Sequence, residues 1–419
     1  MQRRILHIDF DSFFASVEQE RNPAFRNKPL GVTATNGRTC IIASSREAKK
    51  LGIKTGSRTY EAFKLCPALL LTSANFANYW EISKKFIAIC KDFSPFVEVF
   101  SIDELFMDIT LTEHLFGGVI PLITKLKTRI REEIGEYITV SVGISYNKML
   151  AKMASGLKKP DGIFAITPDR LDHVYQIAKL QDVCGIGPRI EKRLNMMGIY
   201  TLTKLNKTPC DKLVAEFGNV CGNFLYNVGQ GQDESSIRSY AEAPGVKSVG
   251  RNYCLPHNEY DRRIVLQNVY ELCEEVCIKL RRLKKKARAF GIYLSGTESI
   301  HGHILHNYYS DRGSDMFQTC LEVLNKESPY KETPLQQGYV RQIGVWAGYL
   351  QDSKKLPSSL FPTEQKWGRV TQVVDEINEK FGDHTIRNGF LLYADKLTTV
   401  PNGYMADKYE RTKLAESAI

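Results

Sequence analysis

The chain has 419 residues, of which 43% are hydrophobic and 25% charged, and it carries a formal net charge of +10. This composition is ordinary for a soluble globular protein of two to four domains, and the positive balance suits either a polyanionic partner or a plain basic surface. The sequence has no apolar run of about 18 residues and no signal-peptide pattern, so we expect no membrane span and a cytoplasmic location. The ten cysteines form no CxxC pair, which favours reduced thiols and no zinc site.

The first predicted element is a short apolar strand that carries acidic residues. It covers residues 5–11, and Ser12 is placed to cap the helix that follows. We expect Asp9, near the end of this strand, to join a functional cluster and Asp11 to face water.

The next segment predicts two strands and a basic helix. Residues 30–35 and 39–43 form the strands around a turn, and one of the serines at 44–45 caps a short helix. Arg46 and Lys49 lie on one face near the start of this helix. Two cations there can bind a triphosphate, and a solvated basic face is the alternative.

The central feature is a pair of adjacent carboxylates between two predicted strands. Residues 96–100 and 105–109 are apolar and rich in strand formers, and Asp103 and Glu104 lie between them. Adjacent residues on extended backbone point to opposite faces, so both acids serve one site only if the chain turns there. Burial of a carboxylate costs several kcal/mol without a partner, and no Lys or Arg adjoins the pair. A divalent ion is therefore the expected partner, with a solvated hairpin tip as the alternative.

A three-carboxylate cluster results if Asp9 joins this pair. Such clusters hold two Mg²⁺ ions about 3.5–4 Å apart in phosphoryl transfer. Strands and helices alternate up to about residue 165, which predicts an α/β domain with an insertion. The remaining elements expected here are helices at 59–65, 75–93, 119–136 and 147–157 and a strand at 139–144.

Short helices follow from residue 171. Gly185, Gly187 and Arg189 stand in helix-hairpin-helix spacing, in which backbone N–H groups approach a DNA phosphate regardless of sequence. A tight turn between two helices is the alternative.

A polar linker is expected at 235–247, followed by a separate α+β domain with the order βαββαβ over 248–350. Its basic run includes Lys284, Lys285 and Lys286, which favours a surface that follows DNA phosphates, with a solvated face as the alternative.

Five segments together resemble the Y-family translesion DNA polymerases, close to the bacterial DNA polymerase IV and V group. They occur in the family's order, the resemblance covers about residues 1–350, and the set is far more specific than any one motif. The segments are residues 8–14, 47–53, 101–104, 141–148 and 159–162.

The resemblance implies a multidomain fold of α/β and α+β parts that resembles a right hand. The implied parts are a palm at 1–25 and 75–165, fingers at 26–74, a thumb at 166–234, a linker at 235–247, a little finger at 248–350 and a C-terminal extension at 351–419. The implied activity is low-fidelity, template-directed extension of a primer on DNA with dNTPs and two Mg²⁺ ions, and we expect a monomer.

The resemblance also implies roles for individual residues. Asp9, Asp103 and Glu104 match the metal ligands, with the Phe10 carbonyl as an auxiliary ligand, and Phe14 matches the steric gate that excludes a ribose 2′-hydroxyl. The other implied contacts are Phe13, Arg46, Lys49 and Lys159 to the nucleotide and Leu360 and Phe361 to a sliding clamp. Many relatives have Tyr and Arg in place of Arg46 and Lys49, and the usual leading Gln of the clamp peptide is absent.

Two rival functions remain at this point. A metal-dependent nuclease would use the same carboxylates but would need neither a gate nor triphosphate-binding cations. A non-catalytic DNA-binding scaffold would have no use for the acids, whose burial is costly.

Overall fold

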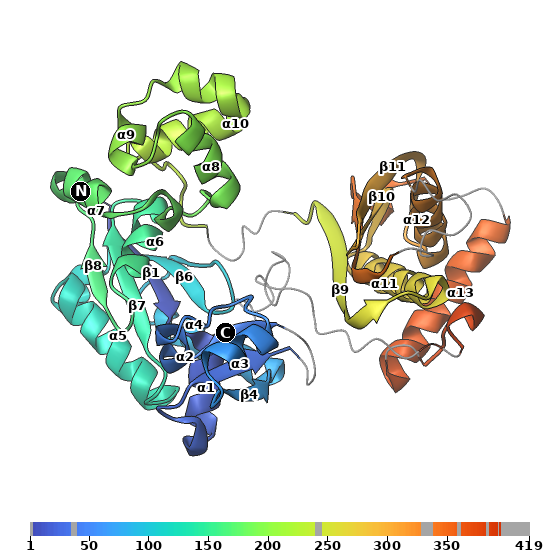
Figure 1. The fold of residues 1–419 in the computed structure, drawn as a ribbon, viewed down its shortest axis with the longest axis horizontal. Helices are drawn as coiled ribbons and strands as arrows, with labels where there is room; N and C mark the ends of the chain where they lie inside the picture. Colours follow the sequence, from blue (N-terminus) through green and yellow to red (C-terminus); the bar gives the residue numbers. More distant parts are fainter. Residues whose placement is uncertain are drawn as a thin grey trace. The chain divides into compact units, whose positions relative to one another are not determined.

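The computed structural model describes residues 3–34, 40–238, 245–327, 338–357, 362–382, 385–392 and 394. The described residues fall into two compact units, one ending at residue 238 and the other beginning at residue 245 (Figure 1). Among the described helices, none combines the length and apolar character that a membrane span requires.

The first unit is built on a five-stranded sheet with the order β5-β6-β1-β7-β8. The central strand β1 runs antiparallel to both of its neighbours, and β7 and β8 run parallel. The bounds are β1 Ile5–Phe10, β5 Val97–Val99, β6 Glu104–Asp108, β7 Val140–Ser145 and β8 Ile163–Ala165.

Alternation along β1 gives its two faces different roles. Leu6 and Ile8 point into the large core that the sheet forms with helices α1, α4 and α5, whereas Ile5 packs on the other face with α6. His7 and Asp9 share the face of Ile5, so the alternation directs them to the α6 side. The helix bounds are α1 Phe13–Arg21, α4 Phe76–Lys91, α5 Val119–Glu133 and α6 Lys148–Leu157.

A smaller sheet with the order β3-β2-β4 completes the α/β part of the first unit. The predicted helix start is confirmed at Ser45, whose hydroxyl accepts a hydrogen bond from the Ala48 N–H (3.3 Å). The bounds are β2 Leu30–Thr33, β3 Ile41–Ser44, β4 Leu70–Ser73, α2 Arg46–Lys50 and α3 Thr59–Leu65.

Short helices follow the α/β part, as the sequence predicts. The turn before α8 contains Gly185, whose φ of 105° favours glycine, and α8 begins with Pro188 directly after Gly187. The bounds are α7 Leu171–Ile177, α8 Pro188–Met196, α9 Leu202–Asn206 and α10 Cys210–Gly229.

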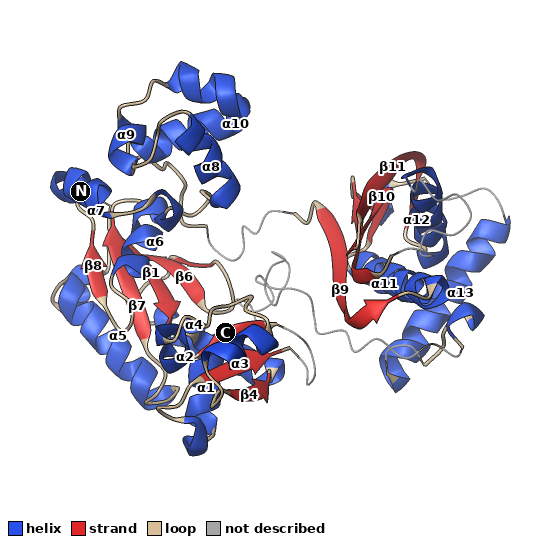
Figure 2. Ribbon diagram, viewed as in Figure 1, coloured by secondary structure: helices blue, strands red, loops and turns tan. Residues whose placement is uncertain are grey.

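The second unit has the predicted βαββαβ order. Its antiparallel sheet has the order β11-β10-β12-β9, and α11 and α12 pack together with it around one apolar core (Figure 2). The bounds are β9 Ser248–Glu259, α11 Arg262–Arg282, β10 Lys285–Gly296, β11 Ser299–Ser310, α12 Gly313–Glu327 and β12 Val340–Gly348. A short strand β13 (Gln351–Asp352) pairs with β10, and the helix α13 (Pro362–Phe381) follows it.

Candidate active site

The acidic residues meet because β1 and β6 are paired in register at their ends. Asp9 lies directly opposite Glu104, and the Phe10 N–H donates to the carbonyl of Asp103 (3.0 Å). The turn that the two adjacent acids require is present, since the Ser101 N–H donates back to the carbonyl of Glu104 (3.0 Å). The structure therefore brings the three predicted carboxylate residues to one end of the paired strands β1 and β6.

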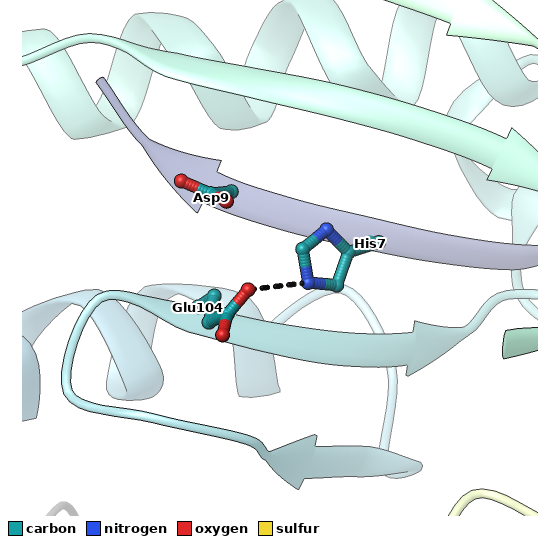
Figure 3. Close-up of side chains that lie close together, drawn as sticks. All are labelled: His7, Asp9 and Glu104. Carbon is teal, nitrogen blue, oxygen red and sulfur yellow. Dashed lines mark ion pairs between the residues drawn. The ribbon is translucent and has the colours of Figure 1, made fainter. Parts of the chain in front are cut away.

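A histidine that the sequence analysis did not single out completes this end. His7 is fully buried, and its Nε2 lies 3.0 Å from a carboxylate oxygen of Glu104. Figure 3 marks this contact with a dashed line. Its Nδ1 lies 2.7 Å from the hydroxyl of Ser155 on α6. The spacing of two residues between His7 and Asp9 was the available signal, because such residues share one face of a strand. Ligand atoms of His7, Asp9 and Glu104 lie within 4.8 Å of one another.

Two lysines neutralise part of this negative charge. Lys159 Nζ lies 2.6 Å from Asp9, and Lys152 Nζ contacts Glu104. No Lys or Arg adjoins Asp103 or Glu104 in the sequence, as the sequence analysis noted, but the fold brings these two lysines to the acids. The cations come from α6 and the turn after it, about 50 and 150 residues away along the chain, where a search of neighbouring residues does not find them.

The environment separates the carboxyl groups by their pKa values. Burial raises the pKa of Asp9 and of Asp103, and the charge of Lys159 opposes the rise at Asp9. Burial also acts to raise the pKa of Glu104, but the hydrogen bond from His7 and the charge of Lys152 outweigh it and hold this pKa at about 2. Burial lowers the pKa of His7, so the imidazole is neutral at pH 7.

The donor set fits a hard divalent cation. The carboxylates of Asp9 and Glu104 lie within reach of one ion, and that of Asp103, next to Glu104 in the chain, accepts a hydrogen bond from the neutral hydroxyl of Ser101 (2.5 Å). Carboxylate oxygens are the ligands that Mg²⁺ prefers, and a cation there would offset the cost of ionising the buried acids.

Phe14 is held by other aromatic rings. It stacks on Tyr79 with the ring centroids 4.3 Å apart and meets Phe76 edge-on at 5.8 Å. The Tyr79 hydroxyl donates to Glu18 (2.7 Å), which fixes the stack from behind. The ring of Phe13, in contrast, lies inside the core, so only its backbone remains for the predicted contact to a nucleotide.

The side chains of Arg46 and Lys49, the two predicted cations of α2, contact residues outside this helix and are not only solvated. Arg46 donates to the hydroxyl of Thr139, and Lys49 Nζ donates to Ser12 Oγ (2.8 Å). Ser12 has a φ of 55° and makes no side-chain cap hydrogen bond, so the prediction that it caps α1 was wrong. Burial and the nearby charge of Lys159 lower the pKa of Lys49.

Asp11 does not face water, and that prediction was wrong. Its side chain is only 3% exposed, and its oxygens accept hydrogen bonds from Thr139 Oγ1, Ser141 Oγ and the Asp161 N–H, each at 2.7 Å. These partners lie 128 to 150 residues away in the sequence, which is why the local pattern did not reveal them.

The predicted DNA contacts belong to both units. Gly185 and Gly187 are exposed in the turn before α8 of the first unit, and Arg189 is exposed in the first turn of that helix. Lys284 is exposed at the junction of α11 and β10 in the second unit. Lys285 and Lys286 are half-buried there.

Arg281, from the same basic run, forms a two-point ion pair with Asp375 of α13 (2.5 and 2.8 Å), so it does not contribute to a phosphate surface. The expected clamp residues Leu360 and Phe361 lie outside the described residues.

Comparison with protein families gives a consistent result along the chain. Residues 8–156 match the impB/mucB/samB family, residues 181–233 match the thumb domain of DNA polymerase iota, and residues 246–360 match the C-terminal domain of the impB/mucB/samB family. These three matches cover most of the chain in the order of its structural parts.

Individual proteins agree with the family matches. The DNA polymerase IV of Pelotomaculum thermopropionicum is 33% identical over 392 residues, which cover 92% of this chain and 94% of that protein. The DNA polymerase IV of Moorella thermoacetica is 31% identical, with coverage of 93% and 96%. A solved Y-family DNA polymerase chimera has a TM-score of 0.70 at 25% identity and covers 83% of this chain and 98% of its own.

The fold and the matches define a polymerase of the right-hand type with a helix-hairpin-helix thumb, which confirms the fold class that the resemblance implies. The chain belongs to the impB/mucB/samB family, and thus to the Y-family DNA polymerases. It is a DNA-directed DNA polymerase of the translesion type, as expected from its motifs.

Proposed function

We propose that the chain adds dNTPs to a primer 3′-hydroxyl with Mg²⁺ as the metal and Asp9, Asp103 and Glu104 as the side chains that hold two such ions. The observation that carries this assignment is the register of β1 with β6, which sets Asp9 opposite Glu104 with Asp103 beside them. The Phe10 carbonyl is the proposed auxiliary ligand.

The other residues around the acids have further proposed roles in binding the triphosphate. When bound, the two ions supply activation of the 3′-hydroxyl and neutralisation of the phosphate charge that develops during transfer. Lys159, which contacts Asp9 here, is proposed to turn to the triphosphate together with Arg46 and Lys49. Lysine acts as a point charge toward phosphate, whereas Arg46 can form two parallel hydrogen bonds.

Phe14 is proposed as the steric gate. An aromatic ring beneath the sugar collides with a 2′-hydroxyl, and the stack with Tyr79 gives the Phe14 ring a fixed position from which to do so. Exchange of Phe14 for Ala should therefore allow ribonucleotide incorporation while deoxynucleotide incorporation persists. Tyr79→Phe keeps the stacking ring and is the matched control, for which we expect little ribonucleotide incorporation.

Binding of primer–template DNA is proposed to use Gly185, Gly187 and Arg189 on one unit and Lys284, Lys285 and Lys286 on the other. Contacts to the phosphate backbone make binding salt-sensitive and nearly independent of sequence. We also propose a cytoplasmic monomer that acts in DNA damage tolerance.

The deciding experiment is extension of a primed template with Mg²⁺ and dNTPs, with wild type beside Asp103→Ala. We expect extension by wild type and a loss of about a thousandfold or more in the variant, with DNA binding retained. Shortening of the primer would indicate a nuclease instead. DNA binding without extension by pure wild type would favour the scaffold function and would refute the assignment of the carboxylates.

A sliding clamp is the proposed accessory partner, with Leu360 and Phe361 as its contacts. The support is the sequence segment alone. Leu360→Ala combined with Phe361→Ala should abolish stimulation by the clamp and leave basal extension unchanged. Equal loss with and without the clamp would show that the pair has a structural role.

A further inference from the structure

Asp11 is a buried carboxylate that the proposed chemistry does not use. The carboxylates proposed to hold the metal ions are those of Asp9, Asp103 and Glu104, whereas both oxygens of Asp11 are occupied by two hydroxyls and a backbone N–H. β1 ends at Phe10, so the side chain of Asp11 departs from the strand alternation and turns to the start of β7 and the turn after α6. Its burial and its three short hydrogen bonds call for an explanation other than metal binding.

One oxygen of Asp11 connects two parts of the chain that carry the proposed triphosphate cations. Oδ2 accepts from the Asp161 N–H (2.7 Å), two residues after Lys159. The same oxygen accepts from Thr139 Oγ1 (2.7 Å), which in turn accepts from Arg46, and the Arg46 guanidinium itself lies 3.8 Å from it. Asp11 thus contacts both cation-bearing segments from one buried position.

The other oxygen anchors this arrangement to the sheet. Oδ1 accepts from Ser141 Oγ (2.7 Å) on β7, and the Asp11 N–H donates to the Thr139 carbonyl (2.9 Å). Lys127 and Arg131 of α5 bind the Asp161 carboxylate at 2.8 and 2.5 Å, so the turn is held from both sides. A turn held this firmly limits where the long Lys159 side chain can reach.

We propose that Asp11 is a positioning residue for the nucleotide: its buried carboxylate fixes the Lys159 turn and the Arg46 side chain so that both cations meet the triphosphate of the incoming dNTP. The inference rests on the proposed function of those two cations. Small misplacement of a charged group at a reacting centre lowers rates strongly, so a device that fixes two cations at once is useful there.

The test measures KM for dNTP, kcat and Kd for DNA in single-nucleotide incorporation. Asp11→Ala should raise KM about tenfold or more, with kcat less affected and Kd for DNA unchanged, because the cations serve ground and transition states alike. Asp11→Asn keeps an oxygen for the Asp161 N–H and should recover most of the loss. In the double variant with Lys159→Ala, Asp11→Ala should raise KM far less than it does alone.

The matched control is Asp108→Ala, which removes a hydrogen-bonded carboxylate from the opposite end of the same sheet. This variant loses a carboxylate of the same sheet, with the stability that it provides, and leaves the residues around Arg46 and Lys159 unchanged. A KM rise in Asp11→Ala no larger than in Asp108→Ala, or effects of Asp11→Ala and Lys159→Ala that multiply independently, would overturn the inference.

Failure of the inference and failure of the proposed function give different results. Unchanged KM in both Arg46→Ala and Lys159→Ala would refute the triphosphate assignment and this inference with it. Raised KM in those two variants, with Asp11→Ala at the control level, refutes the inference alone. If Asp11→Ala does not fold, Thr139→Val removes the hydroxyl that links Arg46 to Asp11, and a KM within about twofold of wild type would then overturn the part of the proposal that concerns Arg46.

Discussion

The charges of buried acidic residues are compensated differently at two places, one in each unit. In the second unit, Glu271 is 1% exposed and lies 3.3 Å from Arg387. Glu275 likewise lies 3.2 Å from Arg251, so each of these acids has a guanidinium of its own. Where β1 and β6 meet in the first unit, three acidic residues share two lysines, and the carboxylate of Asp103 accepts a hydrogen bond from the neutral hydroxyl of Ser101.

This difference separates a structural use of charge from a functional one. A buried acid with its own cation is compensated inside the protein and holds elements together. The three acids of the first unit share two lysines, Lys152 and Lys159, and burial raises the pKa of Asp9 and Asp103. The negative charge that the two lysines leave uncompensated is the physical reason that a divalent ion would be favoured beside these acids.

Removal of a matched cation in the second unit should have the largest effect. Arg387→Met leaves the carboxylate of Glu271 buried without its guanidinium, which should lower the free energy of unfolding of this unit by at least about 2 kcal/mol. Chemical denaturation followed by a probe in the second unit measures it. An unchanged stability would show that the ion pair does not hold the C-terminal segment, and primer extension should persist under native conditions.

His7 offers a further test of this comparison. It contacts Glu104 of the acidic cluster and, as a neutral imidazole, adds no positive charge. In His7→Leu the Glu104 carboxylate loses its contact at 3.0 Å, and residues behind metal ligands usually change metal affinity by 10–100-fold. We expect the Mg²⁺ concentration for half-maximal extension to rise about tenfold. His7→Gln retains a donor and serves as the control; equal Mg²⁺ dependence in His7→Leu and wild type would contradict the orienting role.

The change in the free energy of unfolding should have opposite signs in Asp103→Asn and in Arg387→Met. Burial raises the pKa of Asp103 above its unfolded value, so its contribution to stability is present at acidic pH and is lost as pH rises through the folded pKa. Without metal at pH 7, the variant should be more stable than wild type by about 0.5–2 kcal/mol, yet inactive.

A pH series of thermal unfolding tests this sign. The advantage of Asp103→Asn should shrink as the pH falls through the raised pKa of Asp103, where the wild-type carboxylate takes up its proton. Addition of Mg²⁺ should also reduce the difference, because the ions bind wild type and stabilise it. A variant that is less stable than wild type at pH 7 would mean that the carboxylate is compensated after all.

The sequence predicted what depends on neighbouring residues. Strand and helix positions followed from periodicity, and the helix start at Ser45 followed from local capping, which the structure confirms. The three acids of the cluster were found because each stands at the end of an apolar strand. The βαββαβ order of the second unit was predicted for the same reason.

Long-range contacts were beyond such reasoning. The partners of Asp11 come from residues 139–161, and the lysines that contact Asp9 and Glu104 come from α6 and the turn after it. The sequence showed neither that Asp11 is buried nor that two cations already lie against the acids. These points depend on tertiary contacts, which cannot be inferred from the spacing of residues along the chain.

The smallest effect should come from an ion pair on the surface, and it tests whether burial is the cause of the others. Arg129 on α5 binds Glu133 one turn away (2.6 Å) and also Asp92 (2.8 Å), in contact with solvent. Glu133→Gln should lower stability by only about 0.3–0.5 kcal/mol, and less at high salt, because water screens the charges. A loss as large as that of Arg387→Met would show that charge pairing in general, rather than its burial, distinguishes the two units.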